Sequence, residues 1–219
     1  NEIKPSYNET QMEILFVSNP ITEEIKSISC IDINNDKKKE LAWITEKKLT
    51  ISSFLNNELD VISSVDIPTE LTPLSLESLK IRGTEMLIAN LFDDKAKNFK
   101  ARLYYFDDKS KMLMEDKSFP DNYFYKSSYS VSGEKFIIAR KGDNFKTSLF
   151  RGNIKILDSK DFSFKDMEIQ KEFEFFPSLV TGNYTKNDGK EWVSLDSKGS
   201  ITIFTSNFDK VFETDSAFG

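Results

Sequence analysis

Hydrophobic and polar residues alternate with a period of two along much of the chain. Segments such as Ile25–Ile31, Leu49–Ser52 and Ile201–Phe204 are short, rich in β-branched and aromatic residues, and end near clusters of Asp, Asn, Lys or Gly. This period is typical of β-strands with one buried face. Apolar residues nowhere recur at helical spacing between good capping residues, so we expect a β protein with little helix.

The predicted strands recur in one order, with a period of about 45 to 50 residues. In the first copy, Ile25–Ile31 is followed by an acidic turn and then by the strands Leu41–Thr45, Leu49–Phe54 and Leu59–Ile67. Three further copies follow the same plan. The four predicted units are residues 21–67, 68–119, 120–170 and 171–215.

Repeats of four short antiparallel strands are typical of β-propeller blades. A single four-stranded sheet has two faces to cover, and radial stacking lets neighbouring blades cover them. We therefore predict an all-β propeller with about four blades in this chain. A β-sandwich with similar strand lengths is the alternative, which the matching order of the turns disfavours.

Both ends of the chain resemble parts of further repeats. Residues 1–20 contain an apolar segment, Met12–Ser18, that we expect to complete a neighbouring blade, and residues 216–219 look like the start of a following repeat. These segments favour a fragment of a larger ring over a closed four-bladed one. An open arc would expose a sheet face at each end, and such faces tend to associate.

Oxygen-bearing side chains alternate in the acidic turn of the first unit. Asp32, Asn34, Asp36 and Glu40 stand at positions one, three, five and nine of a calcium loop, and the backbone carbonyl of Lys38 would supply position seven. Alternate residues of a tight loop direct their oxygens to a common centre, where Ca²⁺ accepts about six to eight of them. We expect Ca²⁺ as a cofactor here. The loop joins two strands, so it is not an EF-hand.

The fourth unit carries a weaker loop at the same place. Its ligand positions hold Asn183, Thr185, Asn187 and Glu191, with one carboxylate among them. This loop has little negative charge for a divalent cation, and we expect it to be held by side-chain hydrogen bonds. The corresponding turns of the second and third units are short and predict plain hairpins.

The segment Asp32–Leu41 resembles the loop of FG-GAP repeats, also described as VCBS-type repeats, of integrin-α-like β-propellers. That loop runs D-x-[DN]-x-[DN]-G-x-x-[DE]-[IL], and the segment departs from it only at Lys37, which replaces the Gly. The Gly adopts a positive φ, so Lys37 costs about 1 kcal/mol there. The resemblance covers the strand plan of nearly the whole chain but rests on two loops.

The resemblance implies a ring of about seven blades, of which this chain would hold about four. It also implies a calcium-binding interaction or cell-adhesion module. Most relatives of this kind are extracytoplasmic, that is secreted, periplasmic, surface-anchored or lumenal, where calcium is abundant enough to fill loops of moderate affinity.

Composition narrows the classes of partner and of chemistry. The chain has 30 Lys plus Arg against 36 Asp plus Glu, a net charge of −6 with the signs mixed, so we do not expect nucleic acid as a partner. It has no His, which excludes catalytic triads, catalytic dyads and zinc sites that need a His side chain. Cys30 lies in an apolar strand, and we expect it to be a small buried residue. No apolar run is long enough to span a bilayer.

These observations predict a non-catalytic module that binds another protein or serves as a scaffold, with other chains or blades of the same propeller as further partners. A lectin-like role is the alternative, because clusters of aromatic side chains could stack on sugar rings, although such aromatics more often pack between blades. These aromatics are Phe92, Phe99, Tyr104–Phe106, Phe173, Phe175 and Phe176. An enzyme is the least expected class, since no catalytic constellation is visible.

Overall fold

The computed structural model describes residues 21–55, 58–81, 83–129, 134–142, 150–167, 179–182, 184, 191–195, 199–205 and 209–214. Within these ranges no helix is long and apolar enough to cross a membrane. The predictions for Met12–Ser18, for residues 1–20 and for residues 216–219 lie outside the described residues.

The described residues form four antiparallel sheets of four strands, each paired in chain order. Blade 1 consists of β1 (Ser27–Ile31), β2 (Glu40–Ile44), β3 (Lys48–Leu55) and β4 (Glu58–Asp66). Blade 2 consists of β5 (Leu71–Ile81), β6 (Thr84–Asp93), β7 (Asn98–Asp107) and β8 (Met112–Asp116). Blade 3 consists of β9 (Tyr123–Tyr129), β10 (Lys135–Gly142), β11 (Phe150–Leu157) and β12 (Phe164–Asp166). Blade 4 consists of β13 (Val180–Gly182), β14 (Glu191–Leu195), β15 (Ile201–Phe204) and β16 (Lys210–Glu213).

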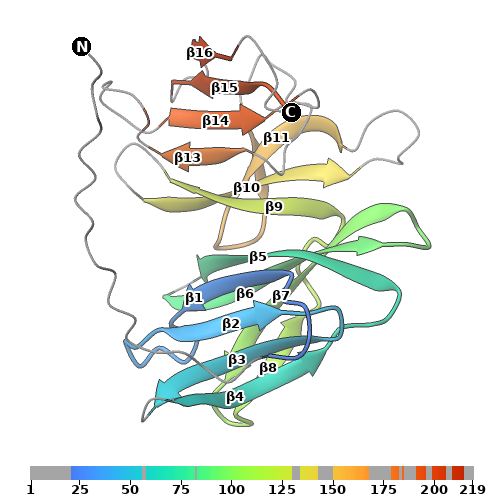
Figure 1. Ribbon diagram of the computed structural model, residues 1–219, viewed down its shortest axis with the longest axis vertical. Coiled ribbons are helices and arrows are strands. Elements are labelled where there is room, and N and C mark those ends of the chain that lie inside the picture. Colours follow the sequence, from blue (N-terminus) through green and yellow to red (C-terminus); the bar gives the residue numbers. More distant parts are fainter. Residues whose placement is uncertain are drawn as a thin grey trace, which may run out of the picture.

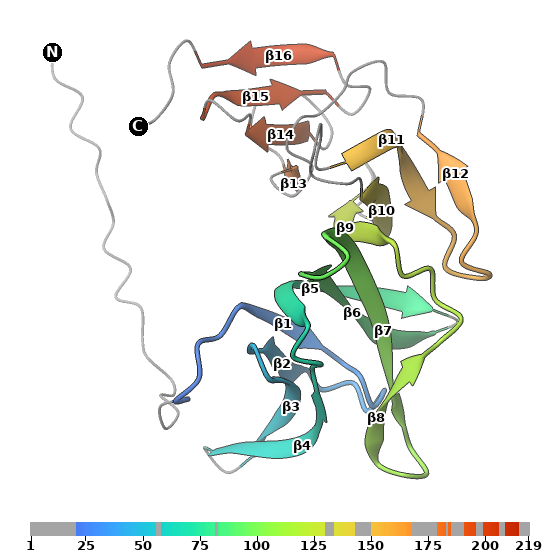
Figure 2. The same ribbon diagram turned by 90° about the vertical axis from the view of Figure 1, so that its right-hand side faces the viewer.

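The four sheets stack as consecutive blades of a propeller. The first strands of the blades contact one another in turn, β1 with β5, β5 with β9, and β9 with β13. Blade 1 and blade 4 lie at opposite ends of the resulting arc (Figures 1 and 2). The predicted all-β architecture of four-stranded antiparallel blades is confirmed, and each sheet lies within one of the four predicted units.

Apolar clusters join neighbouring blades. We call the face of a blade that packs on the following blade its leading face, and the face that packs on the preceding blade its trailing face. The leading face of blade 1 presents Ala42, Ile44, Leu49 and Ile51, each 0% exposed, to blade 2. Two further clusters join blade 2 to blade 3 and blade 3 to blade 4. Burial of these faces is the main driving force that holds the arc together.

Hydrogen bonds between blades fix their register. The Ser27 hydroxyl of blade 1 accepts a hydrogen bond from the Leu76 amide of blade 2, at 3.0 Å. At the outer edge of the same interface, the Ser63 hydroxyl accepts from the Leu113 amide, also at 3.0 Å. These bonds provide acceptors for two backbone N–H groups that are not paired within the strand ladders.

Cys30 is exposed, so the expectation that it is buried is wrong. It pairs with Leu41 across blade 1, and both residues belong to the trailing face. That face has no blade packed on it among the described residues. Alternation along the strand correctly indicates that Cys30 points to a sheet face, but whether that face is covered depends on the neighbouring blade.

Candidate functional site

The loop between β1 and β2 is held by hydrogen bonds from its own backbone. The Lys37 amide donates to Asp32 Oδ2 at 3.1 Å, the Asp36 amide to Asn34 Oδ1 at 3.0 Å, and the Lys38 amide to Asp36 Oδ1 at 2.8 Å. Side chains at the first three predicted ligand positions therefore turn inward along the loop. This is how Asp and Asn stabilise a tight turn.

Lys37 adopts the left-handed backbone conformation that the glycine of the FG-GAP pattern would adopt. Its φ is +69°, and Asn35, two residues earlier, has a φ of +60°. Asn tolerates this region well, whereas Lys is strained there by its Cβ. The sequence pattern thus predicts the backbone path correctly even where the residue departs from it.

Glu40, the first residue of β2, closes the loop. It is 2% exposed, and its Oε2 accepts a hydrogen bond from the Ile33 amide at 2.9 Å. Burial raises the pKa of the Glu40 carboxyl, and the negative charges of Asp36 and Asp32 raise it further, while the Ile33 N–H group acts in the opposite direction. Three carboxylates that repel one another in this way are a setting in which a cation would be stabilising.

The carboxylate and amide oxygens of the loop are of the kind that bind a hard cation such as Ca²⁺. The Oδ1 atom of Asp32 is buried and has no hydrogen-bond partner. An unpaired buried carboxylate oxygen is costly, and a cation would relieve that cost. In the part of the chain that the structure describes, however, no three His, Cys, Asp or Glu side chains are already arranged around a common metal position. The loop therefore contains oxygen ligands of the right kind, but in the described residues these oxygens do not converge on one metal position.

The loop is also tied to blade 2 through Glu85, which follows the β5–β6 turn. Glu85 accepts hydrogen bonds from the Asp32 amide and from the Lys39 ammonium, each at 2.9 Å. Burial raises the pKa of Glu85, but these two donors outweigh it, so the pKa lies below its usual value. Glu85 could not be predicted from the sequence, because the short turn before it has the pattern of a plain hairpin.

Of the second predicted loop, the structure describes Tyr184 and Glu191. Asn183, Thr185 and Asn187 lie outside the described residues. Glu191 is 2% exposed at the start of β14, and its Oε2 accepts a hydrogen bond from the Tyr184 amide at 2.7 Å. This bond spans seven residues, as does the bond between Ile33 and Glu40. The glutamate at position nine therefore has the same structural role in both loops.

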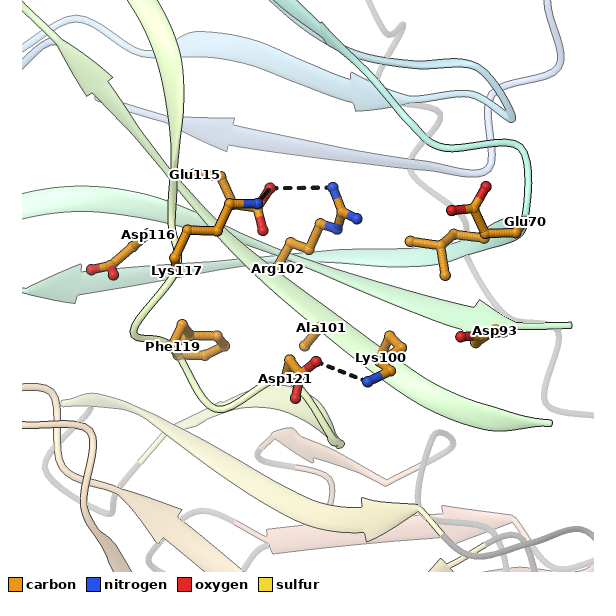
Figure 3. Close-up of a pocket in the computed structure, with 11 residues that line it drawn as sticks. Glu70, Asp93, Lys100, Ala101, Arg102, Glu115, Asp116, Lys117, Phe119 and Asp121 are labelled. Carbon is orange, nitrogen blue, oxygen red and sulfur yellow. Dashed lines mark hydrogen bonds and ion pairs between the residues drawn. The ribbon is translucent and has the colours of Figure 1, made fainter. Parts of the chain in front are cut away.

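An open cavity of about 560 Å³ lies beside β7 and the connection from β8 to β9 (Figure 3). Its acidic side chains are Glu70, Asp93, Glu115, Asp116 and Asp121. Arg102 pairs with Glu115 at 3.2 Å, and Lys100 pairs with Asp121 at 2.8 Å, so these basic side chains are engaged by acids. Lys117 also pairs with Glu115. The cavity could accept a polar group of a partner by exchange of ion pairs, but its polar side chains are not arranged as a nucleophile with a base.

Most of the described aromatic residues considered as sugar platforms pack inside the arc, whereas Tyr105 on β7 is only half-buried. Phe99, Tyr104 and Phe106 are buried. The ring of Phe92 meets that of Phe99 edge to face, with centroids 5.8 Å apart. The segment Phe173–Phe176 lies outside the described residues.

The sequence matches no protein-family model and no curated protein. Among solved structures, the Dos1 propeller resembles the chain at 12% identity with a TM-score of 0.49, covering 90% of this chain and 49% of its own. BBS1N in complex with ARL6DN resembles it at 11% identity with a TM-score of 0.44 in the mercury-soaked crystal, covering 81% of this chain and 49% of its own. The lead-soaked crystal gives 10% identity and a TM-score of 0.48, covering 85% of this chain and 54% of its own. The chain thus spans about half the length of these proteins.

Proposed function

We propose that the chain is a non-catalytic protein-interaction or scaffold module of the FG-GAP type, in which calcium stiffens the loop from Asp32 to Glu40. The observation that supports this proposal is the contact between that loop and Glu85 of blade 2. Through Glu85 the loop lies against a neighbouring blade. A cation bound in it would brace two blades, which is a structural role.

The ion would be held by the side chains of Asp32, Asn34, Asp36 and Glu40 and by the carbonyl of Lys38. When bound, it would supply the positive charge that offsets repulsion among the three carboxylates. The protein fixes the loop ends beforehand, because Glu40 holds the Ile33 amide and Glu85 holds the Asp32 amide. An extracytoplasmic location would suit such a loop, since calcium there is abundant.

Two features of the described residues support an interaction role over the alternatives. The basic side chains of the cavity in Figure 3 are paired with acids, which leaves them poorly placed for acid–base chemistry. The buried aromatics between the blades are equally poorly placed to stack on a sugar. We therefore propose a protein partner and place a glycan second.

Calorimetric titration with CaCl₂ tests the calcium part of the proposal. We expect one saturable site with a dissociation constant of about 10⁻⁵ to 10⁻³ M, because the loop is open and strained at Lys37. Asp32→Ala should abolish the heat of binding. Asp60→Ala is the matched control, since it removes an exposed acid of the same blade outside the loop. Binding that survives Asp32→Ala, or no binding at all by the intact chain, would refute the calcium site.

A further inference from the structure

The cavity beside β7 lies where the sheet of blade 2 is incomplete (Figure 3). β8 pairs only with Leu103–Asp107 of β7, which leaves the outer edge of residues 98–102 without a strand beside it. The chain crosses below this edge towards blade 3, and the Asp121 carbonyl accepts a hydrogen bond from the Ala101 amide at 2.7 Å. The cavity is therefore formed by blade 2 and the connections on either side of it, in the middle of the chain.

The cavity carries an excess of negative charge. Five acidic side chains line it against three basic ones. Each basic side chain is already paired with an acid, and Glu115 is shared, because both Arg102 and Lys117 pair with it. A cation from a partner would bring the charge of the cavity closer to zero, whereas an anion would meet repulsion.

Glu70 is the acid of the cavity that no group engages. It is exposed, and among the described residues its carboxylate makes no hydrogen bond and no ion pair. Asp93 and Asp116 also lack an ion pair, but Asp93 accepts two hydrogen bonds from amides of the turn after β6, and Asp116 accepts hydrogen bonds from Ser118. The Glu70 backbone is fixed, because its carbonyl accepts from the Asp94 amide at 3.3 Å. Its carboxylate is thus available to a cationic group.

A buried hydroxyl beside the cavity also lacks a partner. Tyr104 is 0% exposed, and its hydroxyl makes no hydrogen bond in the part of the chain that the structure describes. Tyr104 stands opposite Glu115 in the pairing of β7 with β8. Burial raises the pKa of its hydroxyl, while the charge of Arg102 acts in the opposite direction, so the guanidinium lies near that hydroxyl. An unpaired buried hydroxyl is costly, and Arg102 could relieve that cost by donating to it.

We propose that this cavity binds a lysine or arginine side chain on the surface of a partner protein. The Glu70 carboxylate attracts the cation, and Glu115 accepts it in place of Arg102. The displaced guanidinium then donates to the Tyr104 hydroxyl, so that no charge is left without a partner. A small apolar ligand would need an enclosed apolar site, whereas this open cavity is lined mainly by charged side chains and suits a flexible charged one.

This inference rests on the proposed interaction role and names the chemistry of the partner, but it can fail independently of the calcium site. The cavity and the loop from Asp32 to Glu40 share no residue. A chain that binds calcium but ignores a basic peptide would refute the cavity site alone. A chain that binds the basic peptide in this cavity but binds no calcium would refute the calcium site alone.

Fluorescence anisotropy of a labelled tetra-arginine peptide with blocked ends, titrated with the full chain in EGTA at low salt, tests the proposal. We expect a dissociation constant of about 10⁻⁴ to 10⁻³ M, as for a few charge pairs, and weaker binding as NaCl is raised. Glu70→Gln should weaken binding about threefold to fivefold. Glu58→Gln is the matched control, since Glu58 is exposed at the start of β4 and lies outside the cavity. It should leave binding unchanged.

Lys100→Gln should change the affinity in the opposite direction. It removes the partner of Asp121 and makes the cavity more negative, so tetra-arginine should bind about threefold more tightly. Lys165→Gln is the matched control, because it removes an exposed lysine of β12 in blade 3. An equal gain in both variants would show that only the net charge of the chain matters, and would overturn the cavity site.

Tyr104→Phe tests the exchange of partners by Arg102. The variant should bind tetra-arginine about threefold more weakly, because the displaced guanidinium loses its second acceptor. It should not lower the melting temperature of the unbound chain, since the hydroxyl has no partner there to lose. A lower melting temperature with unchanged affinity would contradict the exchange.

Three further results would overturn the proposal. The first is equal weakening by Glu70→Gln and Glu58→Gln, which would assign the attraction to the net charge of −6. The second is tighter binding of tetra-glutamate than of tetra-arginine, which would make the ligand an anion. The third is the lack of saturable binding by the native chain. Circular dichroism of each variant verifies that it is folded.

Discussion

Lys37 is the residue at which the loop of blade 1 stores strain. Its φ of +69° places the Cβ against the following backbone, while its amide is held by Asp32 Oδ2. The loop keeps this conformation because Asp32, Asn34 and Asp36 each accept a backbone hydrogen bond within it. The strain is therefore offset locally by the same side chains that are the proposed calcium ligands.

Replacing Lys37 by Gly should stabilise the fold. Removal of the Cβ relieves about 1 to 2 kcal/mol of strain, part of which is lost to the larger entropy of Gly in the unfolded chain, so we expect a net gain of about 0.5 to 1 kcal/mol. Urea unfolding in calcium-free buffer measures this change. Lys38→Gly, next to it at a position without positive φ, should destabilise instead. Equal effects of the two substitutions would contradict the assignment of strain to Lys37.

At the scale of elements, Glu85 near the start of β6 couples the β1–β2 loop to blade 2. It is the shared acceptor for the Asp32 amide and the Lys39 ammonium, and its side chain is 25% exposed. The contact joins residues 53 positions apart and bridges two blades. It therefore links the local geometry of the loop to the packing of the arc.

We predict that Glu85→Ala lowers the free energy of unfolding by about 1 to 2 kcal/mol, because a partly buried amide and an ammonium lose their acceptor. Chemical denaturation measures the loss. Glu70→Ala, which removes an exposed acid just before β5, should change stability by less than about 0.5 kcal/mol. If both variants behave alike, the Glu85 contact does not couple the blades.

The strand plan could be predicted from the sequence because it is local. Period-two alternation and repeated turn order place β2 and β3 within a residue or two of their observed bounds. Position nine of both loops was also identified, and Glu40 and Glu191 are the residues that close them. The strand bounds and the loop positions depend on residues that are close in sequence, so a sequence pattern is enough to predict them.

The contacts between blades could not be predicted in the same way. The exposure of Cys30 and the role of Glu85 depend on what lies beside each blade, about 50 residues away along the chain. No periodic signal marks such a contact in a single sequence. The repeat indicates that blades stack, but it does not say which side chains meet or which faces stay open.

At the scale of the whole molecule, the described residues form an arc of four blades joined by three similar interfaces. The clusters between blades bury the leading face of each of the first three blades, while the hydrogen bond from the Asp32 amide to Glu85 reinforces the first of these contacts. Calcium at one loop should therefore raise the stability of the blades that it braces, and through them the resistance of the arc to unfolding.

The most direct test of the account is a thermal melt of the chain in millimolar CaCl₂ and then in EGTA. At about 1 mM CaCl₂, dissociation constants of about 10⁻³ to 10⁻⁵ M correspond to a stabilisation of about 0.4 to 2.7 kcal/mol, that is to a rise in melting temperature of roughly 1 to 10 °C for a chain of this size. We predict this rise in the native chain, its loss in Asp32→Ala and its retention in Asp60→Ala. The same melting temperature in CaCl₂ and in EGTA would reduce the loop to a polar turn and contradict the proposed calcium brace.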